Sequence, residues 1–210
     1  MDKDFTRDIS YITQESNKPP HIYKHRMFIR FIRKHIGELG YTLDMGERNT
    51  LTERLEAEFS VKIDSALGDL DEEFNCLKKQ YDLVIFSHVI EHLFNPLLCL
   101  ENIKKVMKPK GVLIIACPIK PHFLTWGRGH FHEMDSYRFR KLLDRAGFEI
   151  VVWEKFHNLR TWRSFMGVRP ILRQFFRSQT MVICRRQTNP YSTSARTKAL
   201  EMEEKFTLKQ

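Results

Sequence analysis

Two nearly uninterrupted apolar runs lie in the middle of the chain. Residues 81–87 (YDLVIFS) and 111–118 (GVLIIACP) consist almost entirely of apolar side chains. Runs of this length and composition are typical of strands that are buried on both faces of a parallel sheet. Four shorter segments predict further strands. They comprise residues 41–46, 60–64, 148–156 and 179–187.

Between these strands, apolar residues recur at the three- and four-residue spacing of amphipathic helices. The predicted helices comprise residues 22–39, 50–59, 95–107 and 135–147. Asn95 followed by Pro96 indicates a helix start, because asparagine caps the free N–H groups of the first turn and proline lacks one. Gly40 and Gly147 are expected to end two of the helices, and residues 109–111 are expected to form a turn.

The alternation of strands and helices predicts an α/β fold with a mostly parallel sheet. In such sheets, ligands bind beyond the carboxyl ends of the strands. Polar residues cluster at such a point in this sequence, because Ser87, His88, Glu91 and His92 directly follow the apolar strand at 81–87. We therefore expect a functional site just beyond this strand.

The composition is that of a globular protein, with 210 residues, 42% hydrophobic and 29% charged. We expect a lead-in and helix at 1–39, a main domain at 40–187 and a tail at 188–210. No apolar run reaches the roughly 20 residues needed to cross a bilayer, and the first residues lack the apolar core of a secretion signal. The four cysteines lack metal-ligand spacing and are interpreted as reduced, which favours a cytoplasmic location.

The net charge is +9, from 35 Lys and Arg against 26 Asp and Glu. This excess favours an anionic partner: a nucleic acid, a phosphate-bearing substrate or a membrane surface. Two interpretations are open for the basic amphipathic helix predicted at 22–39. It either covers the core with a solvated basic face, or it makes peripheral contact with a membrane.

Three blocks of the sequence are similar to a known enzyme family. They are residues 81–118, with SHVIEHLFNP and MKPKGVLIIACP, residues 130–151 (HFHEMDSYRFRKLLDRAGFEIV), and residues 42–46 (TLDMG). Together they resemble the class I S-adenosylmethionine-dependent methyltransferases, in particular the bacterial type 11 and type 12 group. The resemblance spans residues 40–187. It implies a Rossmann-like, twisted sheet with helices on both faces, an antiparallel final strand, and S-adenosylmethionine as cofactor.

The chain departs from the family in two places. The family has a glycine-rich loop after its first strand, which lets the backbone approach the cofactor. Only Gly46 remains here, followed by Glu47-Arg48-Asn49. The connection between Asp64 and Tyr81 is also shorter than in the family, which predicts the loss of a helix and leaves open whether a strand is lost with it.

The resemblance also implies which residues bind the cofactor. Asp44 would order the loop around it, Asp64 would hold the ribose hydroxyls, and Asp69 would lie near the adenine. The eight positions are Asp44, Gly46, Glu47, Asn49, Asp64, Asp69, Ser87 and His88.

Methyl transfer needs little chemistry from the protein, because the sulfonium cofactor carries the reactivity and the enzyme mainly aligns the reactants. A general base is required only when the acceptor holds its proton tightly. The candidates for catalytic roles are His88, His132 and Glu133. Of these, His132 and Glu133 are the candidate bases on the acceptor side.

Glu91 and His92 follow His88 at helical spacing, so the three side chains can share one face. Together with His130 or His132 they could bind a metal ion, or they could brace the turn by hydrogen bonds. The second interpretation is preferred, and no metal site is predicted.

Residues 157–178 are rich in arginine and aromatic side chains. Three interpretations are open for this segment: a lid that packs on the domain, a contact surface for an anionic substrate or membrane, and a surface that stacks nucleic-acid bases. We expect it to fold over or beside the carboxyl-end cleft and to help select an anionic acceptor.

The sequence therefore predicts an S-adenosylmethionine-dependent methyltransferase that acts on a small-molecule or anionic biosynthetic intermediate. Two alternatives remain. The missing glycines are consistent with a methyltransferase-like domain that has lost catalysis and binds a partner. The positive charge is consistent with an RNA methyltransferase.

Overall fold

The computed structural model of this protein describes residues 19–66, 68–72, 79–119, 131–132, 134–157 and 178–187. Its centre is a six-stranded sheet in the order β2-β1-β3-β4-β6-β5. The first four of these strands are parallel, whereas β6 runs antiparallel to both of its neighbours. The predicted Rossmann-like fold with an antiparallel final strand is thereby confirmed.

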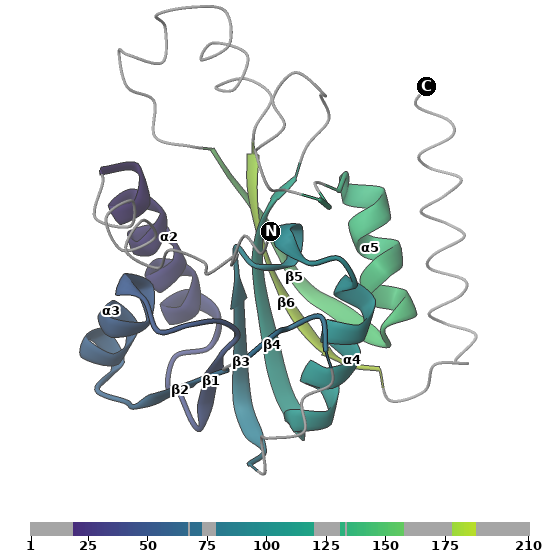
Figure 1. Cartoon of the computed structure of the whole chain (residues 1–210). Coiled ribbons are helices and arrows are strands. Elements are labelled where there is room, and N and C mark those ends of the chain that lie inside the picture. Colours follow the sequence, from purple (N-terminus) through teal and green to yellow (C-terminus); the bar gives the residue numbers. More distant parts are fainter. Residues whose placement is uncertain are drawn as a thin grey trace, which may run out of the picture.

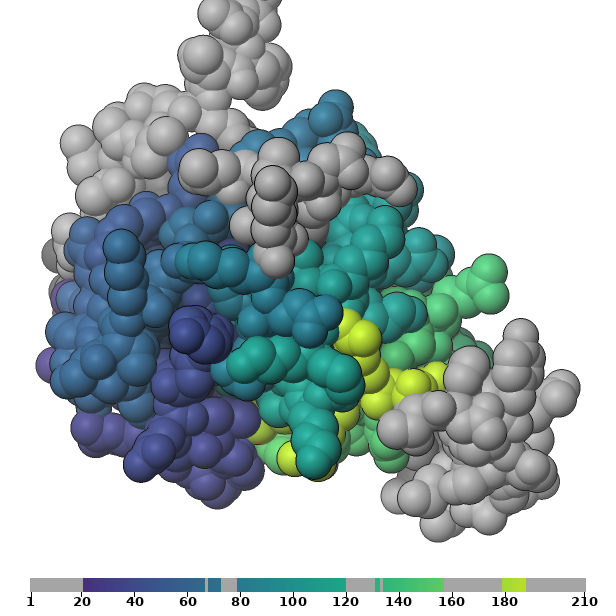
Figure 2. Space-filling model, turned by 90° about the horizontal axis from the view of Figure 1, so that it is seen from below, coloured from purple at the N-terminus to yellow at the C-terminus, as the bar shows by residue number. Residues whose placement is uncertain are grey.

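The strands are β1 (Thr42–Asp44), β2 (Ile63–Ser65), β3 (Tyr81–Ser87), β4 (Met107–Ile119), β5 (Phe148–His157) and β6 (Ser178–Arg186). The helices are α2 (Pro19–His35), α3 (Thr50–Phe59), the short 3₁₀ helix η1 (Ile90–His92), α4 (Pro96–Val106) and α5 (Ser136–Arg145). Helices α2 and α3 lie on one face of the sheet, and α4 and α5 lie on the other (Figure 1). Figure 2 shows the molecule from below, with the N-terminal elements in purple to blue on one side and α5 in green on the other.

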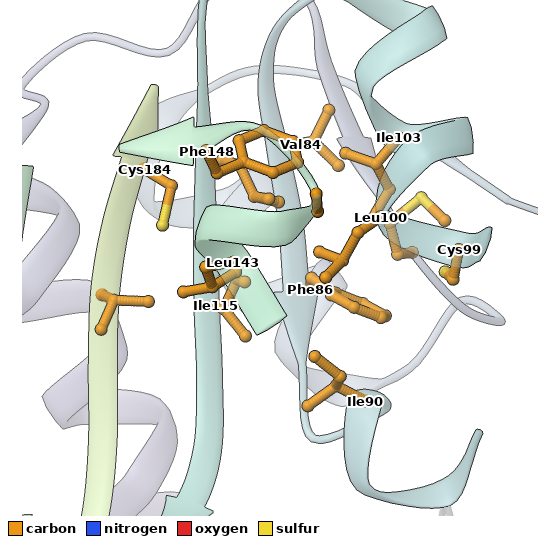
Figure 3. Close-up of a cluster of buried hydrophobic side chains, with 14 of the residues drawn as sticks. Val84, Phe86, Ile90, Cys99, Leu100, Ile103, Ile115, Leu143, Phe148 and Cys184 are labelled. Carbon is orange, nitrogen blue, oxygen red and sulfur yellow. The ribbon is translucent and has the colours of Figure 1, made fainter. Parts of the chain in front are cut away.

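The core between the sheet and α4 and α5 explains the two long apolar runs. Phe86 of β3 and Ile115 of β4 are fully buried against Leu100 of α4 and Leu143 of α5, with Phe148 of β5 beside them (Figure 3). Burying an apolar side chain of this size contributes about 1.5–3 kcal/mol. The apolar runs are therefore strands covered on both faces, as predicted.

Helix α2 covers the second face of the sheet with its apolar side. Phe28, Phe31 and Ile32 are buried in a cluster that includes Leu55 of α3 and Ile85 of β3. This packing agrees with the interpretation of the helix as a cover of the core. No helix among the described residues is both long and apolar enough to cross a membrane.

Ion pairs fix the C-terminal end of α2 to the rest of the domain. Lys34 and His35 both lie within hydrogen-bond distance of the Glu154 carboxylate on β5, at 2.6 and 2.7 Å. Arg33 pairs with Glu58 of α3. These contacts orient α2 across both α3 and the antiparallel part of the sheet.

Two local predictions were wrong. Helix α2 ends at His35 rather than at Leu39, because Gly37 adopts a left-handed conformation (φ +78°) and its N–H donates to the Ile32 carbonyl at 3.2 Å. The expected turn at 109–111 is an irregularity within β4 instead. Tyr81 pairs with Met107 but Leu83 pairs with Val112, so the extra residues are accommodated inside the strand.

The connection between β2 and β3 is described only at residues 66, 68–72, 79 and 80. Of the described residues between Ser65 and Tyr81, none lies in a helix or strand. Among the described strands, the three-residue β2 lies at one edge of the sheet.

The described cysteines are Cys99, Cys117 and Cys184; they are buried and form no disulfide, and burial raises the pKa of each thiol.

Candidate active site

Strands β1, β3 and β4 end at one edge of the sheet. Two hydrogen bonds extend the ladder past the strand ends: the Met45 N–H donates to the Ile85 carbonyl at 2.8 Å, and the His88 N–H donates to the Ala116 carbonyl at 2.7 Å. Asp44 lies in register with Ile85. The sequence-predicted residues Asp44 and His88 are thus placed at the carboxyl edge, where ligands bind in folds of this kind.

Asp44 is tied to the start of α3 by a short network. The Thr52 hydroxyl donates to Asp44 Oδ2 at 2.6 Å and accepts from the Asn49 N–H at 3.2 Å. The Asn49 side-chain oxygen in turn accepts from the N–H groups of Leu51, at 2.8 Å, and Thr52, at 3.4 Å. This capping box fixes the loop between β1 and α3 at both ends.

The Asp44 carboxyl group is only 3% exposed. Burial raises its pKa to about 6, because the charged form loses hydration. The hydrogen bond from Thr52 opposes this effect without cancelling it. The end of β1 therefore holds a carboxyl group that titrates close to neutral pH.

The loop between β1 and α3 contains one glycine whose backbone conformation other residues disfavour. Gly46 has φ +148°, a region that side chains disfavour, and its N–H donates to the Asp44 carbonyl at 3.1 Å. Glu47 is exposed, and its carbonyl accepts from the Asn49 side-chain amide at 3.0 Å. Asn49 thus uses both ends of its side chain to shape this loop.

Asp64 already has two donors. Its Oδ2 accepts from the Tyr81 hydroxyl and from Lys79 Nζ, each at 3.0 Å. The hydrogen bond from Lys79 lowers the pKa of this carboxyl below its usual value. An ionised carboxylate has about four acceptor sites, so the side chain retains capacity for a further hydroxyl.

Asp69 lies in an exposed turn that is anchored near the site. Its Oδ1 accepts from the Asp71 N–H at 2.9 Å. The Asp71 carboxylate then accepts from the N–H groups of Phe94, at 3.1 Å, and Asn95, at 2.7 Å. The turn that carries Asp69 is therefore attached to the start of α4.

His88 adopts an unusual backbone conformation directly after Ser87, the last residue of β3. Its φ is +56°, and a left-handed non-glycine residue costs roughly 1–2 kcal/mol. His88 Nδ1 lies 3.1 Å from Glu91 Oε1. Together with the bond to the Ala116 carbonyl, this contact holds the imidazole at the strand end.

Glu91 connects His88 to the segment that contains Phe131 and His132. It is 1% exposed, and its carbonyl accepts from the N–H groups of Phe131, at 2.8 Å, and His132, at 3.1 Å. Burial disfavours its charged form, but the hydrogen bond from His88 and the nearby positive charge of His88 and His92 outweigh burial and lower its pKa. Both candidate catalytic histidines therefore contact Glu91, His88 by its side chain and His132 by its backbone.

His132 Nε2 lies 3.2 Å from the Phe94 carbonyl. Glu133, His130 and almost all of the segment 157–178 lie outside the described residues. Within the part of the chain that the structure describes, no group of three or more His, Cys, Asp or Glu side chains is arranged to hold a metal ion.

Two residues of interest in α2 and α3 were not predicted from the sequence. Thr52 completes the network of Asp44, and its position three residues after Asn49 in a predicted helix start was a usable signal for a capping box. His25 of α2 is buried, and burial, together with nearby positive charges, lowers its pKa to about 4. Nothing in the local sequence singled out this histidine.

Comparison with known proteins agrees with the resemblance seen in the sequence. Residues 60–152, from the end of α3 into β5, match the family model described as a methyltransferase domain. No curated protein matches the chain.

Many solved structures share the fold. A SAM-dependent methyltransferase from Archaeoglobus fulgidus is 16% identical, with a TM-score of 0.63, and the match covers 84% of this chain and 99% of that one. A 1,6-didemethyltoxoflavin-N1-methyltransferase from Burkholderia thailandensis, with bound 1,6-didemethyltoxoflavin and S-adenosylhomocysteine, is 12% identical, with a TM-score of 0.57 and coverage of 86% of each chain. The [4+2]-cyclase SpnF is 14% identical, with a TM-score of 0.55 and coverage of 79% of this chain and 82% of that one.

At these identities the structural matches show the fold, and the family match adds the methyltransferase domain. The family match confirms the resemblance to methyltransferases, and one of the solved structures with the same fold is described as a SAM-dependent methyltransferase.

Proposed function

We propose that this protein is an S-adenosylmethionine-dependent methyltransferase whose cofactor binds at the carboxyl edge of the sheet, between Asp44 and His88. The observation that carries the proposal is the methyltransferase-domain match over residues 60–152, since this match includes the strand end with His88 and Glu91. The hydrogen bond between Asp44 and Thr52, which orders the β1–α3 loop, also supports the proposal.

The cofactor roles follow from position. Asp44 holds the loop through Thr52, and Gly46 lets the backbone approach the ligand because it has no side chain. Asp64 would accept a ribose hydroxyl, and Asp69 would border the adenine. The remaining proposed cofactor-binding residues are Glu47, Asn49, Ser87 and His88.

The main catalytic role of the protein would be to align the reactants. The protein would align the acceptor atom with the methyl group and the sulfur, and alignment alone can supply on the order of 7–11 kcal/mol. His88, held by Glu91, would position the reacting groups. His132 or Glu133 would remove a proton from acceptors that need it.

The acceptor that we propose is a small molecule or an anionic biosynthetic intermediate. The net charge of +9 favours an anionic ligand, and the Burkholderia relative is bound to a small molecule. Residues 157–178 are proposed to help select this acceptor. Replacing Arg160, Arg163 and Arg169 with alanine should weaken acceptor binding in a salt-sensitive way and leave cofactor affinity unchanged.

Calorimetry with S-adenosylhomocysteine tests the proposal. We expect binding, and a rise in melting temperature that grows with ligand concentration. Asp44→Ala should weaken binding, whereas Asp135→Ala, at the cap of α5, should not. Absence of both heat and thermal shift at millimolar ligand would refute the enzyme assignment.

A second candidate is a methyltransferase-like domain without methyl transfer. The loss of the glycine-rich loop favours it, and the fold of SpnF, a protein described as a cyclase, is the same. Screening extracts with labelled cofactor separates the two, since only an active enzyme transfers label to an acceptor. Salt-dependent retention on a polyanion column would favour the third candidate, an RNA methyltransferase.

A further inference from the structure

Two phenylalanine side chains beside the candidate active site are exposed and lie against each other. Phe94 is 71% exposed and Phe131 is 57% exposed. Their ring centroids are 4.4 Å apart, with an angle of 33° between the ring planes. Single exposed apolar residues are common on protein surfaces, but contiguous apolar surface tends to mark a place where something binds. We call Phe94 and Phe131 the phenylalanine pair.

Hydrogen bonds fix the backbone on both sides of the phenylalanine pair. The Phe94 N–H donates to an Asp71 carboxylate oxygen at 3.1 Å, and the Phe131 N–H donates to the Glu91 carbonyl at 2.8 Å. His132 connects the two segments, because its N–H also donates to the Glu91 carbonyl and its Nε2 lies 3.2 Å from the Phe94 carbonyl. The two rings are therefore held in place before a ligand binds, which lowers the entropy that binding costs.

The same contacts attach the phenylalanine pair to the candidate catalytic residues. Phe131 directly precedes His132, one of the two candidate bases, and Glu91 contacts His88 with its side chain at 3.1 Å. Phe94 lies between η1 and α4, after the carboxyl end of β3. Neither phenylalanine is among the positions to which a cofactor role is assigned above. The pair is thus next to the reacting groups and available to the acceptor.

We propose that the phenylalanine pair binds a flat aromatic ring of the methyl acceptor, next to His132. A flat ring stacks on a phenyl group in an offset arrangement and removes apolar surface of both partners from water. The proposal rests on the proposed function and adds the chemical class of the acceptor: a small molecule with an aromatic ring near the atom that receives the methyl group.

A second copy of the chain or a nucleobase could also cover two exposed rings. The continuity of the pair with Glu91 and His132 favours the acceptor, because a ring that binds there lies beside the candidate base. The experiment below separates the three occupants.

The experiment uses two small carboxylates as probes. 2-Naphthoate has a flat aromatic ring system and one negative charge, in keeping with the net charge of +9. Cyclohexanecarboxylate has the same charge but no aromatic ring. Each is titrated into protein with ¹³C-labelled phenylalanine rings, with and without S-adenosylhomocysteine, and binding is followed by NMR.

The variants are Phe94→Leu and Phe131→Leu, which keep an apolar side chain but remove the ring. Each variant also identifies the NMR signals of the ring that it lacks. Tyr41→Leu is the matched control, because Tyr41 is an exposed aromatic residue that precedes β1, at the opposite edge of the sheet.

We expect 2-naphthoate to shift the ring signals of both Phe94 and Phe131. Either leucine variant should weaken its binding by about two- to tenfold, the effect of losing one aromatic contact, whereas Tyr41→Leu should bind it like the unmodified protein. Cyclohexanecarboxylate should bind more weakly than 2-naphthoate. The melting temperature of the variants should stay unchanged, because both rings are exposed.

Transfer of label from the cofactor to extracts provides a functional readout. Phe94→Leu and Phe131→Leu should raise the extract concentration that gives half-maximal transfer, and they should leave the affinity for S-adenosylhomocysteine unchanged. A role confined to packing would instead lower the melting temperature or the cofactor affinity.

Three results would overturn the proposal. In the first, 2-naphthoate leaves both ring signals in place, or the leucine variants bind it like the unmodified protein. In the second, single-stranded oligouridylate shifts the two ring signals and 2-naphthoate does not, which would assign the pair to a nucleobase. In the third, the protein is a dimer in analytical ultracentrifugation that Phe94→Leu dissociates, which would assign the pair to a second copy.

The two proposals fail separately. If the unmodified protein does not bind S-adenosylhomocysteine, the proposed function fails, while the titration without this ligand still shows whether the phenylalanine pair binds an aromatic ring. If S-adenosylhomocysteine binds and 2-naphthoate does not reach the pair, only the inference about the acceptor fails.

Discussion

Thr52 donates a hydrogen bond to Asp44 across 2.6 Å, and this bond joins the end of β1 to the first turn of α3. Both side chains are buried, at 0% and 3% exposure. A buried carboxyl group with a single side-chain donor is destabilised in its charged form. The pair therefore couples the shape of the proposed cofactor loop to the protonation of Asp44.

The first prediction is a pH dependence of stability that originates at Asp44. Its pKa rises from an ordinary value of 3.8 to about 6 on folding, so the folded protein holds this proton more tightly than the unfolded chain. The resulting stabilisation is complete below pH 3.8 and is lost as the pH rises through about 6. Two pKa units correspond to at most about 3 kcal/mol.

Asp44→Asn should remove this component, because the amide does not titrate and its oxygen still accepts from Thr52. Urea denaturation at a series of pH values from 4 to 8 measures the effect. An identical pH profile for the variant and the unmodified protein would contradict the assignment of the raised pKa to Asp44.

The second prediction concerns Thr52. Thr52→Val keeps the shape of the side chain but removes the hydroxyl, so the buried Asp44 carboxyl loses its donor and the Asn49 N–H loses its acceptor. We expect a loss of about 1–3 kcal/mol in the free energy of unfolding. Thr52→Ser retains the hydroxyl and should lose clearly less. Equal stability of the two variants in urea titrations would show that the hydrogen bonds contribute little.

The third prediction concerns the contact between His88 and Glu91. The pKa of Glu91 is lowered on folding, so its charged form contributes stability at neutral pH that is lost as the pH falls through the folded-state pKa. This sign is opposite to that of Asp44. His88→Ala removes the side-chain partner of a buried carboxylate, which should raise the pKa of Glu91 and destabilise the fold at pH 7.

Glu91→Gln removes the negative charge of the side chain but keeps an acceptor for His88. It also leaves in place the hydrogen bonds from the N–H groups of Phe131 and His132 to the residue 91 carbonyl. Comparison of the two variants with the unmodified protein by denaturation at a series of pH values from 3 to 7 measures the effect. If His88→Ala is equally destabilising across this range, the contact is not electrostatic.

The fourth prediction concerns Gly111, which lies in the irregular part of β4. A methyl group on Gly111 would lie 2.9 Å from the Tyr81 carbonyl oxygen, closer than any normal contact. Gly111→Ala should therefore cost about 1–3 kcal/mol, the range for overpacking. Gly37→Ala is the comparison, since that methyl group meets open space and the left-handed backbone alone costs roughly 1–2 kcal/mol. Thermal denaturation should rank Gly111→Ala as the less stable variant.

The fifth prediction concerns metal. Since Glu91 braces the turn through its carbonyl and through His88, we expect that chelators change neither stability nor cofactor binding. Elemental analysis of the purified protein supplies the check. A near-stoichiometric metal that is lost in His92→Ala would overturn this expectation.

Much of the fold could be predicted because its determinants are local. The apolar run 81–87 became β3 and the periodic segment 50–59 became α3, each with the expected bounds. Asn95 and Asp135 cap the helices that they precede, since a side-chain oxygen reaches only the N–H groups of the next few residues. The carboxyl edge was also predictable, because the ends of parallel strands meet at one edge of a sheet.

The sequence by itself therefore determined most of the elements and the fold class, and it indicated where a candidate site lies. Only the tertiary structure decided which side chains meet there. The contact of Tyr81 with Asp64 and the support of His132 by Glu91 depend on the order of the strands. The ion pair of Arg33 with Glu58 depends on how α2 packs against α3. Periodicity indicates which face of an element is buried, and capping residues indicate where a helix begins. The residues that pack against the buried face come from distant parts of the chain and are fixed only by the tertiary structure.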